Sequence, residues 1–303
     1  MSGRSGGGAA GPAARAPFGR RLAEAMASAG PLCLGVDPHP GLLGDWDLPD
    51  SPAGLAAFSR RALEAAVGPD GSVRVAAIKP QVALYERHGS AGLAVLEELL
   101  GLAREAGVLT IADAKRGDIG STMDGYAAAW LDDASPLAAD AVTLSPYLGF
   151  GTLVPSIRAA HAAGRGVFVL ALTSNPEGRE VQHVGHEANG GAVARRIAEA
   201  AAELNGQLRG EDDWGPVGLV LGATVAADAV RLGLDLPALH GPLLAPGFGA
   251  QGATAAGMRD GFGDAWAQVL ATSSRGILRC GPAVADLIGA IERDRAALRE
   301  DRR

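Results

Sequence analysis

Short apolar runs alternate with alanine-rich segments of helical spacing along most of the chain. Eight apolar runs predict strands, at residues 32–36, 73–78, 108–112, 141–144, 167–172, 218–221, 242–245 and 267–271. The segments between them predict helices at 51–67, 91–106, 122–131, 152–163 and 192–204, several of which begin with Ser, Thr or Pro. Near-continuous apolar strands separated by helices are typical of a parallel sheet covered on its outer face. Eight such units predict an α/β fold of the (β/α)8 TIM-barrel class.

A doubly wound open sheet is the alternative fold. That fold carries Gly-x-Gly-x-x-Gly directly after its first strand, whereas this chain has Leu34-Gly35-Val36-Asp37-Pro38 there. Barrels of roughly 250 residues form single domains, and no polar linker divides the 303 residues after residue 18. We therefore expect a disordered N-terminal tail at 1–16, which is rich in glycine, and one catalytic barrel domain at 17–303.

The composition of the chain limits which binding partners and which cellular compartment we expect. A net charge of −7 and a pI near 5.4 argue against nucleic acid or an anionic membrane, because both recognise a basic face. No apolar stretch approaches the roughly 18 residues of a membrane span. The two cysteines, Cys33 and Cys280, have neither disulfide-framework nor metal-ligand spacing, so we expect free thiols and a cytoplasmic protein.

Lysine is scarce, and both lysines follow predicted strands. Of the 27 basic residues, 25 are arginine and only Lys79 and Lys115 are lysine. A lysine supplies a compact ammonium that can give up a proton, which arginine cannot do. Asp37, Lys79, Asp113 and Lys115 come at the ends of the first three strands, where catalytic residues of α/β barrels lie. They are therefore candidates for the chemistry.

Asp113, Lys115 and Asp118 form an alternating array of charge. Residues two apart on a strand share a face, so Asp113 and Lys115 can both point into the barrel mouth, with Asp118 on the following turn. An ammonium between carboxylates stays protonated, while the carboxylates repel a further anion. The array suits a reaction that expels negative charge and then delivers a proton. The alternative is a salt-bridge network that joins the strand ends.

A second group of residues follows the last two strands. A glycine-rich segment at 245–254 comes after the seventh strand, and Ser273-Ser274-Arg275 come after the eighth. Loops at these positions in α/β barrels frequently bind phosphate through backbone N–H groups. An arginine adds a bidentate charged contact. The pattern predicts a phosphate site opposite the lysines.

These residues carry a family resemblance. Asp113-x-Lys115-x-x-Asp118-Ile119-x-x-Thr122 resembles the signature of the orotidine 5′-monophosphate decarboxylases, with every fixed position present. The resemblance extends from about Phe18 to Ile291 and includes Ile78-Lys79-Pro80, Leu172-Thr173-Ser174-Asn175-Pro176 and Pro246-Gly247-Phe248-Gly249-Ala250-Gln251. The run Thr143-Leu144-Ser145-Pro146-Tyr147 resembles the longer bacterial, type 2 branch. The Asp-x-Lys-x-x-Asp core alone is shared with hexulose-phosphate synthases.

The resemblance implies decarboxylation of orotidine 5′-monophosphate to uridine 5′-monophosphate in pyrimidine biosynthesis, without metal or cofactor. Lys115 would protonate the ring carbon and Asp113 would lie against the departing carboxylate, with Lys79 and Asp118 completing the array. The other implied substrate contacts are Asp37 and Lys79 to the ribose, Ser174 to the pyrimidine, Gln251, Ser274 and Arg275 to the phosphate, and Pro246 in the same pocket. Asp118, Ile119 and Thr122 would reach the neighbouring subunit's site, which implies a homodimer with shared active sites.

Two other functions stay open on the sequence. One is a metal-dependent aldol reaction on a hexulose phosphate, for which the chain lacks an evident extra acidic ligand. The other is a non-catalytic barrel that binds a phosphorylated metabolite. His183-x-x-His186-Glu187 has a metal-like spacing but is better explained as a solvated loop. The sequence leaves open whether Arg116 steers the substrate or faces solvent, and whether Tyr147 lines the mouth or packs.

Overall fold

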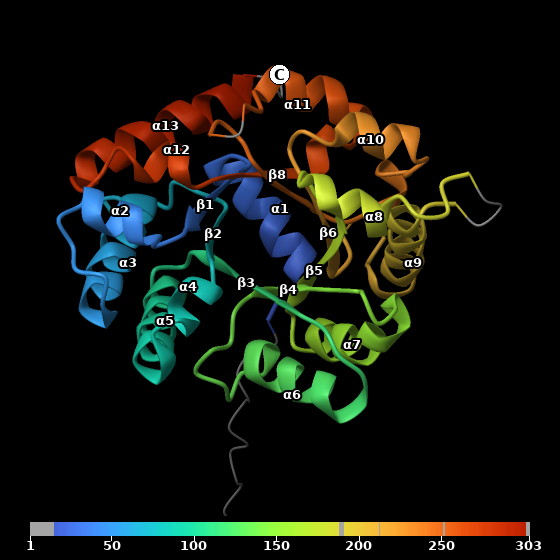
Figure 1. The fold of residues 1–303 in the computed structure, drawn as a ribbon, viewed down its shortest axis with the longest axis horizontal. Helices are drawn as coiled ribbons and strands as arrows, with labels where there is room; N and C mark the ends of the chain where they lie inside the picture. Colours follow the sequence, from blue (N-terminus) through green and yellow to red (C-terminus); the bar gives the residue numbers. More distant parts are fainter. Residues whose placement is uncertain (1–14, 188–190, 212, 251, 301–303) are drawn as a thin grey trace, which may run out of the picture.

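The computed structural model describes residues 15–187, 191–211, 213–250 and 252–300, and eight parallel strands close a barrel there (Figure 1). Each strand pairs with its neighbour in sequence, and β1 also pairs with β8. The predicted (β/α)8 barrel is confirmed. The strands are β1 Leu32–Val36, β2 Ala77–Pro80, β3 Leu109–Arg116, β4 Ala141–Leu144, β5 Gly166–Leu172, β6 Val217–Leu221, β7 Leu243–Pro246 and β8 Val269–Ser273.

Helices precede, separate and follow the strands. The α-helices are α1 Phe18–Ala29, α2 Pro40–Asp45, α3 Pro52–Val67, α4 Ala83–Glu86, α5 Gly89–Glu105, α6 Gly120–Leu131, α7 Val154–Ala162, α8 Arg179–Gln182, α9 Val193–Leu208, α10 Ala226–Arg231, α11 Ala255–Phe262, α12 Arg275–Leu278 and α13 Val284–Glu300. Short 3-10 helices are η1 Phe150–Leu153, η2 Pro176–Gly178, η3 Pro237–Leu239 and η4 Gly263–Gln268. Ser51 begins α3 as predicted, because its hydroxyl accepts the Gly54 N–H.

Two strand boundaries differ from the prediction in ways that matter for the site. β2 begins at Ala77, four residues late, because the Arg74 N–H donates to the Ala66 carbonyl at the end of α3 and not to a neighbouring strand. β3 continues to Arg116, four residues beyond the apolar run. Polar residues therefore lie inside β3, and the end predicted for this strand at residue 112 was too early.

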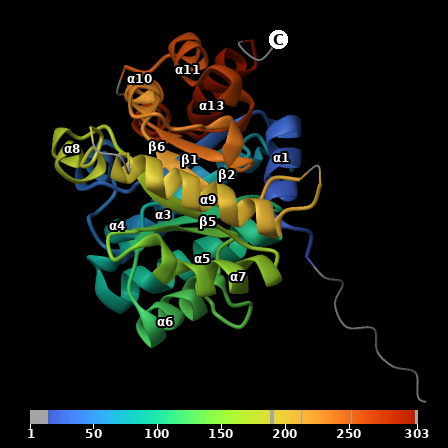
Figure 2. The same ribbon diagram turned by 90° about the vertical axis from the view of Figure 1, so that its right-hand side faces the viewer.

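Helix α1 closes one end of the barrel. Its Phe18, Leu22 and Met26 are buried in a core with inward-facing strand residues, and Phe18 meets Phe168 edge-on at a centroid distance of 6.0 Å. A Cβ built on Gly166 would lie 2.1 Å from the Phe18 ring, so this packing requires glycine. Figure 2 shows α1 on the side of the barrel opposite α4 and α8. The open mouth is therefore at the carboxyl ends of the strands.

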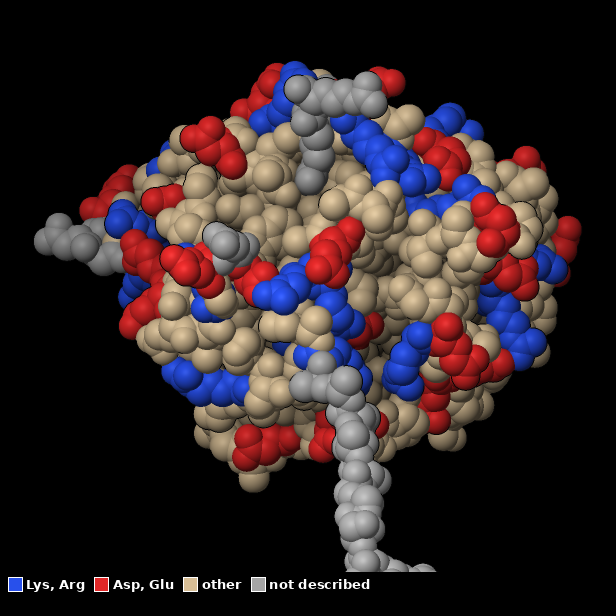
Figure 3. Space-filling model, turned by 180° about the vertical axis from the view of Figure 1, so that it is seen from behind, with Lys and Arg blue, Asp and Glu red and all other residues tan. Residues whose placement is uncertain are grey.

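The closed face carries interspersed charges of both signs (Figure 3). On α1, Arg20 pairs with Asp213 at 2.7 Å and Arg21 pairs with Asp140 at 2.6 Å. Arg15, at the end of the expected tail, donates to Asp133 at 2.9 Å; residues 1–14 lie outside the described part. No helix of the described residues is long and apolar enough to cross a bilayer.

Candidate active site

The Asp113 carboxylate, on β3 at the open mouth, accepts four hydrogen bonds. Its Oδ1 accepts from Lys115 Nζ at 2.5 Å and from Thr143 Oγ1 at 3.0 Å. Its Oδ2 accepts from Lys79 Nζ at 2.8 Å and from Gln81 Nε2 at 3.1 Å. Asp113 is only 8% exposed. The surrounding side chains therefore hold the carboxylate in a single orientation between two ammonium groups.

An irregular stretch of β3 brings Asp113 and Lys115 together. Ala112 pairs with Val142 and Arg116 pairs with Leu144, so β3 has more residues than β4 between these two pairs. Lys115 lies in this stretch with a φ of 48°, a left-handed conformation that is uncommon outside glycine. The predicted proximity of the two side chains is present, but a bulge produces it and not simple strand alternation.

The charges of this cluster support one another. Burial alone would raise the pKa of the Asp113 carboxyl, but the charges and hydrogen bonds of Lys115 and Lys79 outweigh it and hold that pKa well below its usual range. Burial would lower the pKa of Lys79, but the charges of Asp113 and Asp37 overcome that effect and raise it. Both groups are therefore charged across the neutral range.

Asp37 follows β1 and extends the cluster. Its Oδ1 lies 3.9 Å from Lys79 Nζ, within ion-pair range. That oxygen is buried and accepts no hydrogen bond from any described residue. Buried polar atoms are nearly always hydrogen-bonded, so the free oxygen of Asp37 is suited to accept a hydroxyl from a ligand.

Asp118, Ile119 and Thr122 do not join this cluster within one chain. The Asp118 Oδ1 accepts the N–H of Ile119 at 2.8 Å, and among the described residues no hydrogen bond or ion pair links it to either lysine. Ile119 is 58% exposed, and Thr122 on the first turn of α6 is also exposed. Within one chain, these three residues are therefore separate from the cluster around Asp113.

Arg116, the last residue of β3, contacts both α4 and α6. Its guanidinium forms an ion pair with Glu86 of α4 and donates to the Ala114 carbonyl at 3.1 Å. The same group lies 5.8 Å from the ring of Tyr126 and 6.0 Å from that of Trp130, both on α6. Arg116 is thus engaged on several sides and does not simply face solvent.

The loops after β7 and β8 lie side by side. Pro246 pairs with Thr272 in the sheet register, and a Cβ built on Gly276 would lie 3.9 Å from the backbone nitrogen of Ala250. Gly247 has a φ of 114°, which gives the β7 loop a conformation that other residues rarely adopt. The two segments predicted to bind phosphate therefore share one part of the rim.

Ser274, after β8, and Asp37, after β1, both lie against Gly35. A Cβ built on Gly35 would lie 1.7 Å from Ser274 Oγ and 3.2 Å from the Asp37 carboxylate, so only glycine admits both side chains. Arg275 is exposed, and no hydrogen bond or ion pair of its side chain is found among the described residues. Gln251, predicted to contact phosphate, lies outside the described residues.

Ser174 follows β5 and lies beside the residue after β6. It is exposed, and a Cβ built on Gly222, which follows β6, would lie 3.2 Å from the Ser174 Cβ. Tyr147, after β4, is 79% exposed, so it does not pack against the barrel as one interpretation expected.

Two residues of the cluster, Gln81 and Thr143, were not predicted from the sequence. Gln81 comes two positions after Lys79, and strand periodicity places the two side chains on one face. Thr143 is a polar residue in the apolar run of β4 and is buried. The spacing of Gln81 and the polar side chain of Thr143 are visible in the sequence. Both side chains donate to Asp113, however, and Asp113 lies on a different strand.

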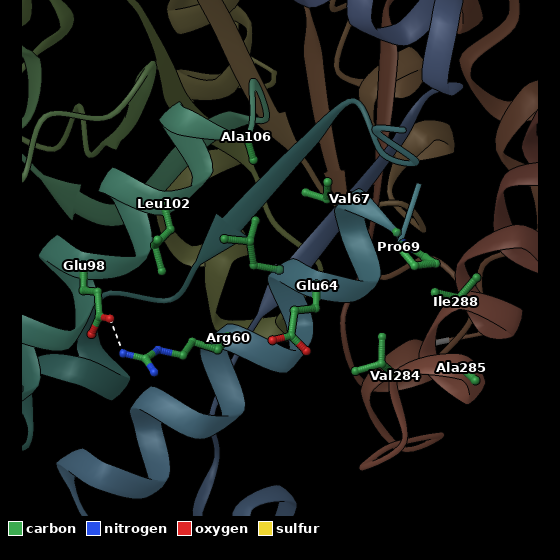
Figure 4. A pocket seen from close by; sticks show the side chains of 12 residues that line it. Arg60, Glu64, Val67, Pro69, Glu98, Leu102, Ala106, Val284, Ala285 and Ile288 are labelled. Atoms are coloured by element: carbon green, nitrogen blue, oxygen red, sulfur yellow. Dashed lines mark hydrogen bonds and ion pairs between the residues drawn. The ribbon is translucent and has the colours of Figure 1, made fainter. Parts of the chain in front are cut away.

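A groove of about 840 Å³ lies elsewhere, between α3, α5 and α13 (Figure 4). It is lined by Leu63, Val67, Leu102 and Ile288 among others, with an ion pair between Arg60 and Glu98 at its edge. None of the candidate site residues lines it. The described residues contain no group of three or more His, Cys, Asp or Glu that could hold a metal ion.

Comparisons with known proteins agree on one family. The model of the orotidine 5′-phosphate decarboxylase / HUMPS family matches residues 30–287. Orotidine 5′-phosphate decarboxylase of Salinispora tropica is 50% identical over 276 residues, which cover 91% of this chain and 95% of that protein. The enzyme of Streptomyces coelicolor is 50% identical over 278 residues, with the same coverage. The solved structure of Leishmania donovani OMP decarboxylase superposes with a TM-score of 0.73 at 29% identity, covering 94% of this chain and 99% of that one.

Proposed function

The chain belongs to the orotidine 5′-phosphate decarboxylase family and converts orotidine 5′-monophosphate to uridine 5′-monophosphate in pyrimidine biosynthesis, and we propose that Lys115, Asp113 and Lys79 carry out the chemistry. The observation that carries this assignment is that Lys115 and Lys79 donate to opposite oxygens of one buried carboxylate. The side chain of Lys115 is 45% exposed and that of Lys79 is 5% exposed. Of the two lysines, Lys115 is the more open to the mouth.

The proposed reaction begins with the substrate carboxylate beside Asp113. Asp113 stays ionised and repels the carboxylate, and contacts to the remote phosphate and ribose offset this unfavourable placement. The bond between ring and carboxylate then breaks. Carbon dioxide leaves, and the bonding electron pair stays on the ring carbon. The fixed ammonium of Lys115 stabilises that charge and transfers a proton from Nζ to form the new C–H bond.

The remaining candidate residues bind the substrate in this proposal. The free oxygen of Asp37 and the ammonium of Lys79 suit ribose hydroxyls. Ser174 contacts the pyrimidine, and Ser274 and Arg275 hold the phosphate with the loop that contains Pro246 and Gln251. Among the described residues nothing pairs with the guanidinium of Arg275, which supports its role, because a planar fork binds phosphate with two hydrogen bonds.

We also propose a homodimer in which Asp118, Ile119 and Thr122 complete the partner's site. The exposure of Ile119, at 58%, of Tyr147, at 79%, and of Leu148, at 52%, supports this arrangement. These side chains follow the neighbouring strands β3 and β4, and exposed apolar residues gathered on one rim are typical of a protein interface. We further propose a cytoplasmic location. The free thiols of Cys33 and Cys280 support it, because cysteines stay reduced in that compartment.

Purified full-length protein with orotidine 5′-monophosphate in excess chelator tests the function. We expect the ultraviolet absorbance of the substrate to change as it is consumed. Lys115→Ala should abolish turnover and leave phosphate-dependent nucleotide binding largely intact. Binding without turnover in the unaltered protein would favour a non-catalytic barrel, and activity on a hexulose phosphate restored by metal would favour the aldol reaction.

A further inference from the structure

In the bulge of β3 the backbone N–H of Lys115 is bound by a side chain of β4. The residues from Asp113 to Lys115 lie between the pairs that Ala112 and Arg116 make with β4, and β4 offers only Thr143 between those pairs. The N–H of Lys115 donates to the side-chain oxygen of Thr143 at 2.9 Å.

The hydroxyl of Thr143 acts as acceptor and donor at once. Since the Lys115 N–H occupies one of its lone pairs, its single proton is free to point to Asp113 Oδ1, 3.0 Å away. The Lys115 ammonium donates to this same oxygen at 2.5 Å. Thr143 is 1% exposed, and its branched side chain has few rotamers. One hydroxyl thus joins the backbone of Lys115 to the carboxylate that its own ammonium binds.

We propose that Thr143 is a positioning residue for decarboxylation, which holds Lys115 in its left-handed conformation with the ammonium against Asp113. The inference rests on the function proposed above. The φ of 48° at Lys115 is unfavourable for a residue with a side chain and persists only where surrounding contacts enforce it. The Thr143 hydroxyl supplies such a contact, and pairing of Arg116 with Leu144 fixes the next residue.

The effect should fall on the chemical step and spare binding. Thr143 contacts the proton donor and Asp113, whereas Ser274 and Arg275, proposed to hold the phosphate, belong to the loop after β8. A displaced ammonium would deliver its proton less well, and a misplacement of about 1 Å can cost on the order of 100-fold in rate. Thr143 therefore controls kcat more than the affinity for the nucleotide.

The chain offers a matched control in Thr110, on the neighbouring strand β3. Thr110 is also buried, its hydroxyl donates to the Asp140 carboxylate at 3.1 Å, and it accepts the Asp140 N–H at 3.1 Å. This pair lies at the other end of β3, away from the mouth. Thr110→Val should lower the melting temperature and leave kcat unchanged.

The test compares Thr143→Val, Thr143→Ala and Thr143→Ser in the full chain. The Val and Ala variants should lose roughly 10- to 100-fold in kcat, with little change in the Kd of uridine 5′-monophosphate, and the Ser variant should recover most of the rate. If the Val variant does not fold, the Ala and Ser pair still isolates the hydroxyl. Equal kcat in the Ala and Ser variants, or a loss no larger than in Thr110→Val, would overturn the role of Thr143. An inactive unaltered protein would instead overturn the proposed function.

Discussion

Lys79 and Lys115 donate to opposite oxygens of Asp113, at 2.8 Å and 2.5 Å. The two ammonium groups differ in their surroundings, because Lys79 is enclosed by the barrel and Lys115 faces the mouth. Lys79 therefore fixes the position and charge of the carboxylate, while Lys115 is placed to meet a ligand. We therefore expect changes at Lys115 to affect turnover, and loss of the pair between Asp113 and Lys79 to affect stability.

Lys115→Arg should retain charge and lose turnover. Arginine keeps a cation near Asp113, but its guanidinium does not give up a proton under ordinary conditions. Removal of a general acid typically costs about 100- to 10,000-fold in rate, and we expect a loss of that size in kcat. Stopped assays of substrate consumption measure it, with the Kd of uridine 5′-monophosphate as the control for binding. An arginine variant that keeps its rate would show that Lys115 acts only through its charge.

Asp113→Asn should destabilise the fold. The change removes the counter-charge of Lys79, whose ammonium is buried, and Asp37 at 3.9 Å is too distant to replace it fully. Removing one partner of a buried ion pair leaves the other charge uncompensated and lowers the free energy of unfolding by roughly 3–5 kcal/mol. Urea unfolding at pH 7 measures the loss. The matched control is Asp50→Asn, which breaks the exposed pair of Asp50 with Arg87 and should change the stability far less.

The stability that Asp113 contributes should disappear in acid. Its folded pKa lies well below the usual range, so its contribution is fully present above the unfolded pKa of about 3.9 and is lost as the pH falls through the folded pKa. The difference in unfolding free energy between the wild-type protein and Asp113→Asn should therefore shrink below about pH 4. Paired urea titrations at several pH values check this. A difference that stays constant down to the acid transition would show that the ion pair is not its source.

Gly35→Ala should weaken substrate binding. The added Cβ would lie 1.7 Å from Ser274 Oγ, so the Ser274 side chain must move away from residue 35. We expect KM to rise on the order of 10-fold, the equivalent of about 1.4 kcal/mol, with a smaller effect on kcat. Gly41→Ala is the control, since nothing lies within 4 Å of a Cβ at that position. An unchanged KM in Gly35→Ala would show that Ser274 does not contribute to phosphate binding.

The barrel could be predicted from the sequence because its signals are local. Apolar runs of strand length recur between helical segments, and Asp113 and Lys115 are close in sequence as well as in space. Thr143 and Gln81 were missed because their roles depend on which strands pair and in what register. The extension of β3 to Arg116 was missed for a related reason. Its polar residues are typical of the end of a strand, whereas in the fold β3 pairs with β4 again at Arg116, after the bulge.

Mixing two inactive variants should restore activity if active sites are shared. In a dimer of one Lys115→Ala chain and one Asp118→Asn chain, one site lacks both groups. The other combines the intact Lys115 of the second chain with the intact Asp118 of the first. Random reassociation of equal amounts should return about a quarter of wild-type activity, because half of the dimers are mixed and each holds one intact site. Dissociation and reassociation of each variant alone is the control and should return none. If the mixture stays inactive although mass spectrometry detects mixed dimers, Asp118 acts within its own chain.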